Sequence, residues 1–266
     1  MVAELTTSAA RASEFCQQNG FAYRFDWGPN GLRTLAPTVA VVVIVDVLRF
    51  TSAVSAAIES GAIVFPYRWA DDGAAEYAHA HGAVLAGFRE QGGLSLSPTD
   101  LLTIETGTRL VLPSPNGSAL SFAAQQHGAT HVLAGCLRNA SATARAALEL
   151  AEGGPIAVIA AGERWHGATG PIRPAVEDLL GAGAVLAALD PSAAASAPSC
   201  SPEAAAARAA FVGARPRLHE TLAACASGRE LIHRGWDDDV ANCAALDVAA
   251  ITAVLDGDHF RAWPPV

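Results

Sequence analysis

The chain has 266 residues, with 17 basic and 26 acidic side chains and a formal net charge of −9. Its hydrophobic fraction is 51% and its charged fraction 16%, below the roughly 25% of average globular proteins, which excludes an intrinsically disordered chain. The acidic balance argues against nucleic acid as a partner, because nucleic-acid binders usually present a basic face. All 17 basic residues are Arg, so an anion site here must use guanidinium or backbone N–H groups.

The sequence predicts a soluble cytoplasmic protein with no membrane partner. The longest apolar runs, 39–45 and 179–189, are shorter than the roughly 18–20 residues of a membrane-spanning helix. The N-terminus has no basic segment followed by an apolar core, so no signal peptide is expected. The five cysteines form no Cys-x-x-Cys pair, and free thiols in a reducing compartment are the simplest interpretation.

Apolar β-branched runs alternate with alanine-rich helical stretches along most of the chain. The predicted strands are 39–45, 62–66, 83–88, 109–112, 130–134 and 156–160. The predicted helices are 51–61, 71–82, a helix ending near 127, 139–151 and 174–189. This alternation predicts an α/β layered sandwich.

Two segments break the alternation. Residues 190–202 are rich in Pro, Ser and Ala and indicate a flexible linker within a single domain that spans 1–266. Beyond this linker the chain reads as mostly helical to Leu255, which predicts a helical cap rather than further sheet. The chain has 59 alanines, so we expect close helix packing through small side chains, either within the chain or across a homodimer.

The first candidate site follows the apolar run 39–45. Asp46 stands at the carboxyl end of this predicted strand, where open α/β sheets place their ligands. Arg49, Thr51 and Ser52 follow as the chain enters a helix, whose N-terminal N–H groups favour anions. A carboxylate for a metal ion, a guanidinium and a helix terminus together predict a phosphate site. The alternative is that Asp46 and Ser52 only cap the helix.

A second candidate is the turn formed by Asn116, Gly117 and Ser118. Asn-Gly permits positive φ, so successive N–H groups can point into one concavity and bind an anion. The alternative is an ordinary loop in which Ser118 caps the following helix.

Two further charged stretches are candidates. Arg164 follows a strand and leads through a glycine-rich loop to Glu177 and Asp178 in a helix. Adjacent helical residues point about 100° apart, so at most one of these acids faces a common site directly. Arg229 and the run Trp-Asp-Asp-Asp at 236–239 lie in the C-terminal helical part. For both stretches the alternative is a solvated, purely structural role.

Several well-defined catalytic and ligand-binding motifs are absent from the sequence. Asp46 lacks a second Asp two positions later, no Cys is followed six positions later by Arg, and a Walker A loop cannot exist without Lys. The histidines show no zinc-ligand spacing. Oxygen and Arg chemistry remain, and Mg²⁺ is the natural cation for such a site.

Taken together, the candidate segments resemble the 2-phosphosulfolactate phosphatase (ComB-like) family. The most characteristic stretch is VVVIVDVLRFTS at 41–52. Further matching segments follow in the same order at 85–93, 115–118, 137–140, 161–164, 177–183 and 228–247. No single segment is decisive, but seven in the same order are specific.

The resemblance implies a three-layer α/β/α sandwich of the ComB-like type with a mostly helical C-terminal part. It also implies a magnesium-dependent phosphatase, a phosphoric monoester hydrolase that converts 2-phospho-3-sulfolactate to 3-sulfolactate in coenzyme M synthesis. Phe88 stands where the family usually has Glu, and the segments at 94–98 and 165–171 also depart from its pattern. Two alternatives therefore stay open: a phosphatase for a different small anionic phosphoester, or a non-catalytic anion-binding member.

The resulting hypothesis places Mg²⁺ on Asp46, with Glu177 or Asp178 contributing directly or through water. Arg49 and Arg164, which we expect to be catalytic with Asp46, would hold oxyanions. The expected substrate-binding residues are Thr51, Ser52, Arg89, Asn116, Gly117, Ser118, Asn139 and Arg229. The role of Asp46 as metal ligand, base or nucleophile is left open.

Overall fold

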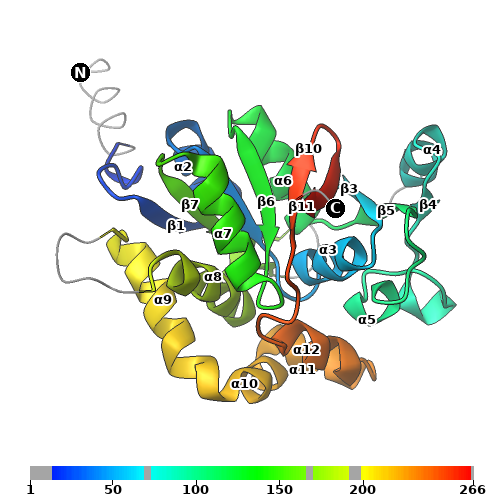
Figure 1. Ribbon diagram of the computed structural model, residues 1–266. Helices are drawn as coiled ribbons and strands as arrows, with labels where there is room; N and C mark the ends of the chain where they lie inside the picture. Colours follow the sequence, from blue (N-terminus) through cyan, green and yellow to red (C-terminus); the bar gives the residue numbers. More distant parts are fainter. Residues whose placement is uncertain (1–13, 69–72, 166–169, 192–198, 265–266) are drawn as a thin grey trace.

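The computed structural model describes residues 14–68, 73–165, 170–191 and 199–264 (Figure 1). Within these residues a nine-stranded sheet has the order β1-β7-β2-β6-β10-β11-β3-β5-β4, with helices packed against it. The strands are β1 (Tyr23–Trp27), β2 (Val41–Val45), β3 (Ile63–Tyr67), β4 (Val84–Leu85), β5 (Arg109–Pro113), β6 (His131–Gly135), β7 (Ile156–Ala160), β10 (Thr252–Asp256) and β11 (His259–Trp263). Two short strands, β8 (Glu163–Arg164) and β9 (Ile172–Arg173), pair separately.

The described helices alternate with strands along most of the chain, and α9 to α12 then follow one another between residues 202 and 244 without an intervening strand. They are α2 (Gly28–Leu35), α3 (Phe50–Glu59), α4 (Gly73–Ala80), α5 (Pro98–Leu101), α6 (Gly117–Gln126), α7 (Ala140–Ala151), α8 (Val176–Leu189), α9 (Pro202–Ala214), α10 (Leu218–Ala224), α11 (Ala226–His233) and α12 (Asp237–Ala244). Short 3₁₀ turns lie at η1 (Ala36–Thr38), η2 (Arg89–Gln91) and η3 (Arg215–Arg217). The mixed α/β class predicted from the sequence is confirmed.

Strand β2 shows why the sheet is covered on both faces. Its five residues are fully buried, and it pairs in parallel with β6 on one side and β7 on the other. Val41, Val43 and Val45 pack into one apolar cluster, while Val42 and Ile44 pack into a second. Because successive side chains of a strand point to opposite faces, this uniformly apolar strand needs helices on both sides.

The first cluster lies under α7, α8 and α9, and the second under α2, α3 and α6. Small residues bring helix and sheet together as the alanine content predicts. A Cβ added at Gly181 of α8 would lie 2.5 Å from Val47 Cγ2, and one at Gly183 would lie 2.2 Å from the Ala207 carbonyl of α9. The two glycines therefore permit contacts that larger residues would block.

The C-terminal end of the chain differs from the prediction. Helices α9 to α12 do follow the linker region, but the expectation of helix to Leu255 is wrong at its end, because 252–255 belong to β10. Hairpin β10–β11 lies between β6 and β3, and β10 runs antiparallel to β6. The hairpin fills the middle of the sheet, and this tertiary pairing outweighs the helical character of the alanine-rich sequence before it.

The N-terminal strand β1 is also absent from the prediction, although it pairs in parallel with β7. Of the predicted linker 190–202, residues 192–198 lie outside the described residues. The end of this segment runs beside β1: the Tyr23 N–H donates to the Ser199 carbonyl at 2.9 Å, and the Ser201 N–H donates to the Tyr23 carbonyl at 2.9 Å. The predicted helix 71–82 is seen as Gly73–Ala80, with 71 and 72 outside the described residues.

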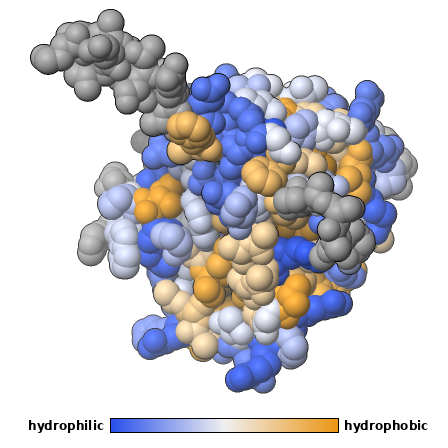
Figure 2. All heavy atoms as spheres, turned by 90° about the vertical axis from the view of Figure 1, so that its left-hand side faces the viewer, coloured by the Kyte–Doolittle hydropathy of each residue, from blue (hydrophilic) through white to orange (hydrophobic). Residues whose placement is uncertain are grey.

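Figure 2 shows the face that carries β1 and α9, where apolar and polar side chains lie intermixed. In the part of the chain that the structure describes, every helix is too short or too polar to cross a bilayer. All five cysteines are free thiols. The homodimer stays a prediction.

Candidate active site

The turn after β2 is held by hydroxyl groups. The Asp46 N–H donates to Thr51 Oγ1 at 3.0 Å, and the Thr51 hydroxyl donates back to the Asp46 carbonyl at 2.8 Å. Ser52 Oγ donates to the Val47 carbonyl at 2.8 Å. Both hydroxyl residues are fully buried. These bonds hold the turn between β2 and α3 and thereby fix the position of Asp46. Ser52 donates to a carbonyl and does not cap the helix, so of the capping alternative only the contact between Asp46 and the Phe50 N–H is seen.

The Asp46 carboxylate lies against the turn before α6. Its Oδ2 accepts the Gly117 N–H at 2.8 Å, and its Oδ1 accepts the Phe50 N–H at the longer distance of 3.4 Å. A Cβ on Gly117 would come within 2.2 Å of Phe50 Cδ1 and 2.8 Å of Asp46 Oδ2, so glycine is required for this approach. Ser118 points elsewhere, because its Oγ donates to the Leu112 carbonyl at 3.1 Å.

Asp178, in the first turn of α8, joins the ends of β2 and β7. Its Oδ1 accepts the Val47 N–H at 2.7 Å, and its Oδ2 accepts the Gly162 N–H at 2.9 Å. Asp178 and Glu177 are both 3% exposed. Both acids are therefore buried at the same strand edge, in contrast to the solvated alternative.

We call Asp46, Glu163, Glu177 and Asp178 the acid cluster. Burial, followed by the charges of Glu163 and Glu177, raises the pKa of Asp46 to about 7, despite the Gly117 and Phe50 N–H bonds that oppose this. Burial, followed by the charges of Asp46 and Glu177, also raises the pKa of Asp178 well above its ordinary value. Among the described residues, no ion pair with Arg or His involves these four carboxyl groups.

The acid cluster offers oxygen donors of the kind that Mg²⁺ prefers. Within the described residues, no three or more His, Cys, Asp or Glu side chains are grouped so that they could hold a metal ion by themselves. Mg²⁺ usually binds one or two carboxylates and completes its coordination with water and substrate phosphate. The donor set therefore fits an ion that shares its ligands with a substrate, and does not fit a closed structural site.

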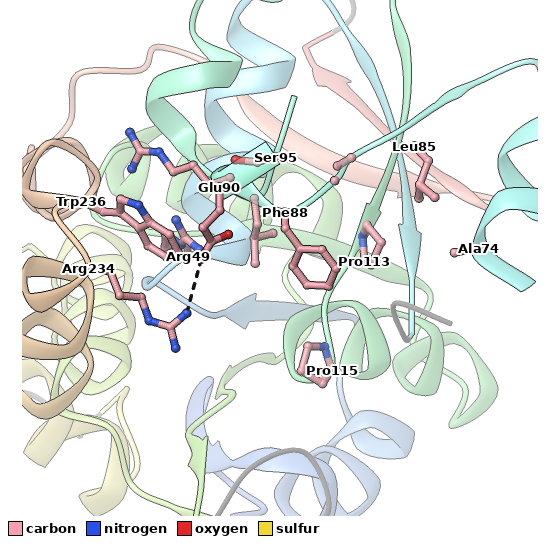
Figure 3. Close-up of a pocket in the computed structure, with 14 residues that line it drawn as sticks. Arg49, Ala74, Leu85, Phe88, Glu90, Ser95, Pro113, Pro115, Arg234 and Trp236 are labelled. Atoms are coloured by element: carbon pink, nitrogen blue, oxygen red, sulfur yellow. Dashed lines mark ion pairs between the residues drawn. The ribbon is translucent and has the colours of Figure 1, made fainter. Parts of the chain in front are cut away.

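A pocket of about 510 Å³ is lined by Arg49 and Pro115, which lie close in the chain to Asp46 and Gly117, respectively (Figure 3). We call it the arginine pocket, because Arg49, Arg89 and Arg234 lie along one side of it around Trp236. The three guanidinium carbons lie 4.7, 5.7 and 5.3 Å from the centre of the Trp236 ring, respectively. Figure 3 shows the opposite side formed by apolar residues, among them Phe88, Pro113 and Pro115.

Arg49 and Arg89 are held by carboxylates of α12. Asp239 is fully buried, and its Oδ2 pairs with Arg49 and, at 2.8 Å, with Arg89. Asp238 is half-exposed and pairs with Arg89 at 2.7 Å. The interpretation of residues 236–239 as a solvated cap therefore does not hold for Asp239.

Arg164 and Asn116 lie next to Glu163 of the acid cluster. Asn116 Nδ2 donates to Glu163 Oε1 at 3.1 Å, and Arg164 Nη1 donates to the Gly170 carbonyl at 3.0 Å. Both residues line a smaller cavity of about 150 Å³. Arg164 Nε is buried with no hydrogen-bond partner among the described residues.

The structure does not bring Asn139 and Arg229 to this region. Asn139 is fully buried, and its amide accepts the Cys136 N–H at 2.9 Å and donates to the Ala134 carbonyl at 3.1 Å, so it is used within the fold. Arg229 lies on the exposed side of α11 and lines a separate open cavity.

Sequence reasoning did not assign Glu163, Arg234, Trp236 or Asp239 to the site. Glu163 and the run 236–239 stood within candidate segments, but nothing in a charge run shows which member is buried. A Trp beside an Asp run is the signal that could have pointed to the arginines, because Trp offers guanidinium groups a flat face.

Comparisons with known proteins identify the family of the chain. A family model described as 2-phosphosulpholactate phosphatase matches residues 30–258. A protein of Thermus thermophilus, described as a probable 2-phosphosulfolactate phosphatase, is 30% identical over 230 residues, which cover 82% of this chain and 88% of that protein. The predicted enzyme class, a phosphoric monoester hydrolase, is confirmed at the level of the family. The chain belongs to the 2-phosphosulfolactate phosphatase family.

Proposed function

We propose that this chain hydrolyses 2-phospho-3-sulfolactate to 3-sulfolactate and phosphate in a Mg²⁺-dependent reaction in the cytoplasm. We also propose that its fold is the α/β/α sandwich of the ComB-like type. The observation that carries the function is the link between the two groups of charges through the turn after β2, which holds Asp46 of the acid cluster and Arg49 of the arginine pocket. Asp46 and Arg49 are three residues apart in one turn, so a phosphate between them would meet a cation site and a guanidinium together.

Asp46 and Glu177 would hold the ion directly. Asp178 already has both oxygens on short backbone N–H bonds, whereas Asp46 Oδ1 has only the 3.4 Å contact with Phe50. We therefore give Asp178 the role of fixing the ends of β2 and β7. When bound, Mg²⁺ would polarise the phosphoryl oxygens and lower the pKa of an attacking water.

The substrate carries a phosphate, a carboxylate and a sulfonate, and needs several separate cationic contacts. Arg49, Arg89 and Arg234 supply such contacts along one side of the pocket. Each guanidinium has five N–H donors in a fixed plane, so it can serve a carboxylate of the protein and an oxyanion of the substrate at once. Charge neutralisation and positioning of this kind supply most of the catalysis of phosphoryl transfer.

One observation favours a second candidate, a phosphatase for a different small anionic phosphoester. Phe88 is 64% exposed and lines the pocket together with Leu85 and Pro113. An apolar wall of this kind is typical of sites that enclose part of a less polar ligand. A larger phosphoester with an apolar substituent would cover this wall, which 2-phospho-3-sulfolactate would leave partly exposed.

Initial rates of phosphate release with and without Mg²⁺ test the proposal. The panel consists of 2-phospho-3-sulfolactate, 2-phospholactate and phenyl phosphate. We expect Mg²⁺-dependent release with the highest kcat/KM for 2-phospho-3-sulfolactate. A higher kcat/KM for another member would favour the second candidate. Binding of the phosphoesters without release of phosphate would show a non-catalytic, anion-binding member and refute the enzymatic proposal.

A further inference from the structure

Asp239 joins three distant segments of the chain at the arginine pocket. Its Oδ2 pairs with Arg49, at the start of α3, and with Arg89 in η2, while its Oδ1 accepts the Ser97 hydroxyl at the start of α5. Arg49 and Arg89 are 190 and 150 residues away in sequence. A fully buried carboxylate requires such partners, because an unpaired buried charge costs several kcal/mol.

The carboxylate and the indole ring fix the two arginines from different directions. Trp236, which directly precedes α12, lies 4.7 Å from the Arg49 guanidinium and 5.7 Å from that of Arg89. Asp239 contacts the same two groups through Nη1 of each, by a hydrogen-bonded ion pair with Arg49 and by an ion pair with Arg89. An ion pair at one nitrogen and an aromatic ring beside the guanidinium together restrict where that group can lie.

Of the two arginines, Arg49 keeps one terminal nitrogen, Nη2, outside the ion pairs of the described residues. Asp239 contacts Nη1 of Arg49, whereas Arg89 pairs with Asp239 through Nη1 and with Asp238 through Nη2, and both arginines line the 510 Å³ pocket. An Arg side chain without such support would lose about 2 kcal/mol of rotamer freedom each time it bound an anion. Two arginines held in place before the substrate arrives avoid most of that loss.

We propose that Asp239 is a positioning residue that holds Arg49 and Arg89 in their substrate-binding orientation without touching the substrate itself. This inference rests on the proposed phosphatase function, and it assigns a task to a residue that acts only through its two arginines. If Asp239 acts in this way, its substitution changes KM, and the change requires that Arg49 is present.

The test uses full-length Asp239→Asn, which keeps the size and removes the charge, and measures kcat and KM for 2-phospho-3-sulfolactate with Mg²⁺. We expect KM to rise about 10- to 100-fold with a smaller change in kcat. The matched control is Asp237→Asn, which removes the same charge from an exposed position two residues earlier and leaves KM unchanged. An unchanged KM in Asp239→Asn would overturn the proposal. A lower KM would overturn it too, by showing that Asp239 competes with substrate for the arginines.

Two further measurements separate positioning from general support of the fold. In Arg49→Ala, added guanidinium ion restores part of the activity. In the double variant Arg49→Ala with Asp239→Asn it restores none, because the carboxylate that would hold the guanidinium ion is absent. Equal rescue in both would contradict the proposal. If Asp239→Asn does not fold, Asp239→Glu is compared with Asp237→Glu. We expect a higher KM in Asp239→Glu only, and equal KM values in the two variants would refute the positioning role.

The outcome also distinguishes this inference from the function on which it rests. A wild-type enzyme that is active while Asp239→Asn keeps its KM refutes positioning alone. A wild-type protein that releases no phosphate refutes the proposed function. In that case calorimetric titration with inorganic phosphate decides on Asp239: weaker binding to Asp239→Asn than to wild type supports positioning, and equal binding overturns it.

Discussion

The acid cluster and the arginine pocket are neighbouring groups of charges that are balanced in different ways. In the arginine pocket, Arg49 and Arg89 both pair with Asp239, and Arg234 lies 2.8 Å from Glu230. In the acid cluster, Asp46 and Asp178 receive backbone N–H groups, and their carboxyl groups repel one another. The positive charges of the pocket are therefore balanced by carboxylates of the protein before a ligand binds. The negative charges of the acid cluster are balanced only when a cation or protons bind.

The largest expected effect comes from removing the central carboxylate of the acid cluster. Asp46→Asn should lower Mg²⁺-dependent phosphate release by about 10²–10³-fold, as is typical when one charge-stabilising contact of a transition state is lost. The control is Asp256→Asn, which removes an exposed carboxylate that pairs with Arg261 at 2.7 Å in the β10–β11 hairpin. It should leave the rate unchanged. Full Mg²⁺-dependent activity in Asp46→Asn would show that the cluster has no part in the reaction.

The incomplete charge balance of the acid cluster also predicts how stability depends on pH. The pKa of Asp46 is raised from 3.8 to about 7, so the folded protein retains a proton that the unfolded chain releases near pH 4. Between these values the unfolded state binds fewer protons, and the free energy of unfolding falls as pH rises. At about 1.36 kcal/mol for each pKa unit, the metal-free protein should lose about 4 kcal/mol between pH 4 and pH 7 through this group.

Urea unfolding of the metal-free protein at pH 4 and pH 7 measures this loss. Asp46→Asn should lose less stability over the same interval, because it lacks the titrating group. Mg²⁺ should stabilise wild type more at pH 7 than at pH 4, since the ion competes with the proton for the carboxylate. The same pH dependence in wild type and Asp46→Asn would contradict this account.

A smaller effect is expected at the contact between the acid cluster and α6. Gly117→Ala places a Cβ within 2.2 Å of Phe50 and 2.8 Å of Asp46 Oδ2, so the turn must move away. We expect a loss of about 1–3 kcal/mol in the free energy of unfolding, as for other overpacked sites. Gly213→Ala in α9, where a Cβ meets no atom within 4 Å, is the matched control. Thermal unfolding of the two variants checks this, and equal Tm values would count against the close approach.

The sequence predicted the elements that carry the acid cluster better than those that complete the arginine pocket. The run 39–45 could only be a buried strand, and its end fixed Asp46 at the correct edge of the sheet. Asp239 could not be found in this way. Asp237 and Asp238 are exposed and Asp239 is buried, and only the packing of α12 against other segments decides which of the three faces inward.

The hairpin β10–β11 shows a second limit. Residues 252–255 follow an alanine-rich helical region and are predicted as helix, but Gly257-Asp258, the two-residue loop between β10 and β11, is a hairpin signal. Thr51, Ser52 and Asn139 are predicted to bind substrate, but their polar groups form hydrogen bonds with backbone groups near strand ends. Residue types that bind ligands also cap helices, and only the hydrogen-bond partners tell the two uses apart.

The measurement that tests the central claim most directly is calorimetric titration of wild type, Asp46→Asn and Arg49→Ala with MgCl₂ and, separately, with inorganic phosphate. If the acid cluster holds the cation and the arginine pocket holds the anion, Asp46→Asn weakens Mg²⁺ binding by about tenfold or more, and Arg49→Ala leaves it unchanged. Phosphate binding without Mg²⁺ should show the reverse. Loss of Mg²⁺ binding in Arg49→Ala, or its full retention in Asp46→Asn, would contradict this division between the two regions.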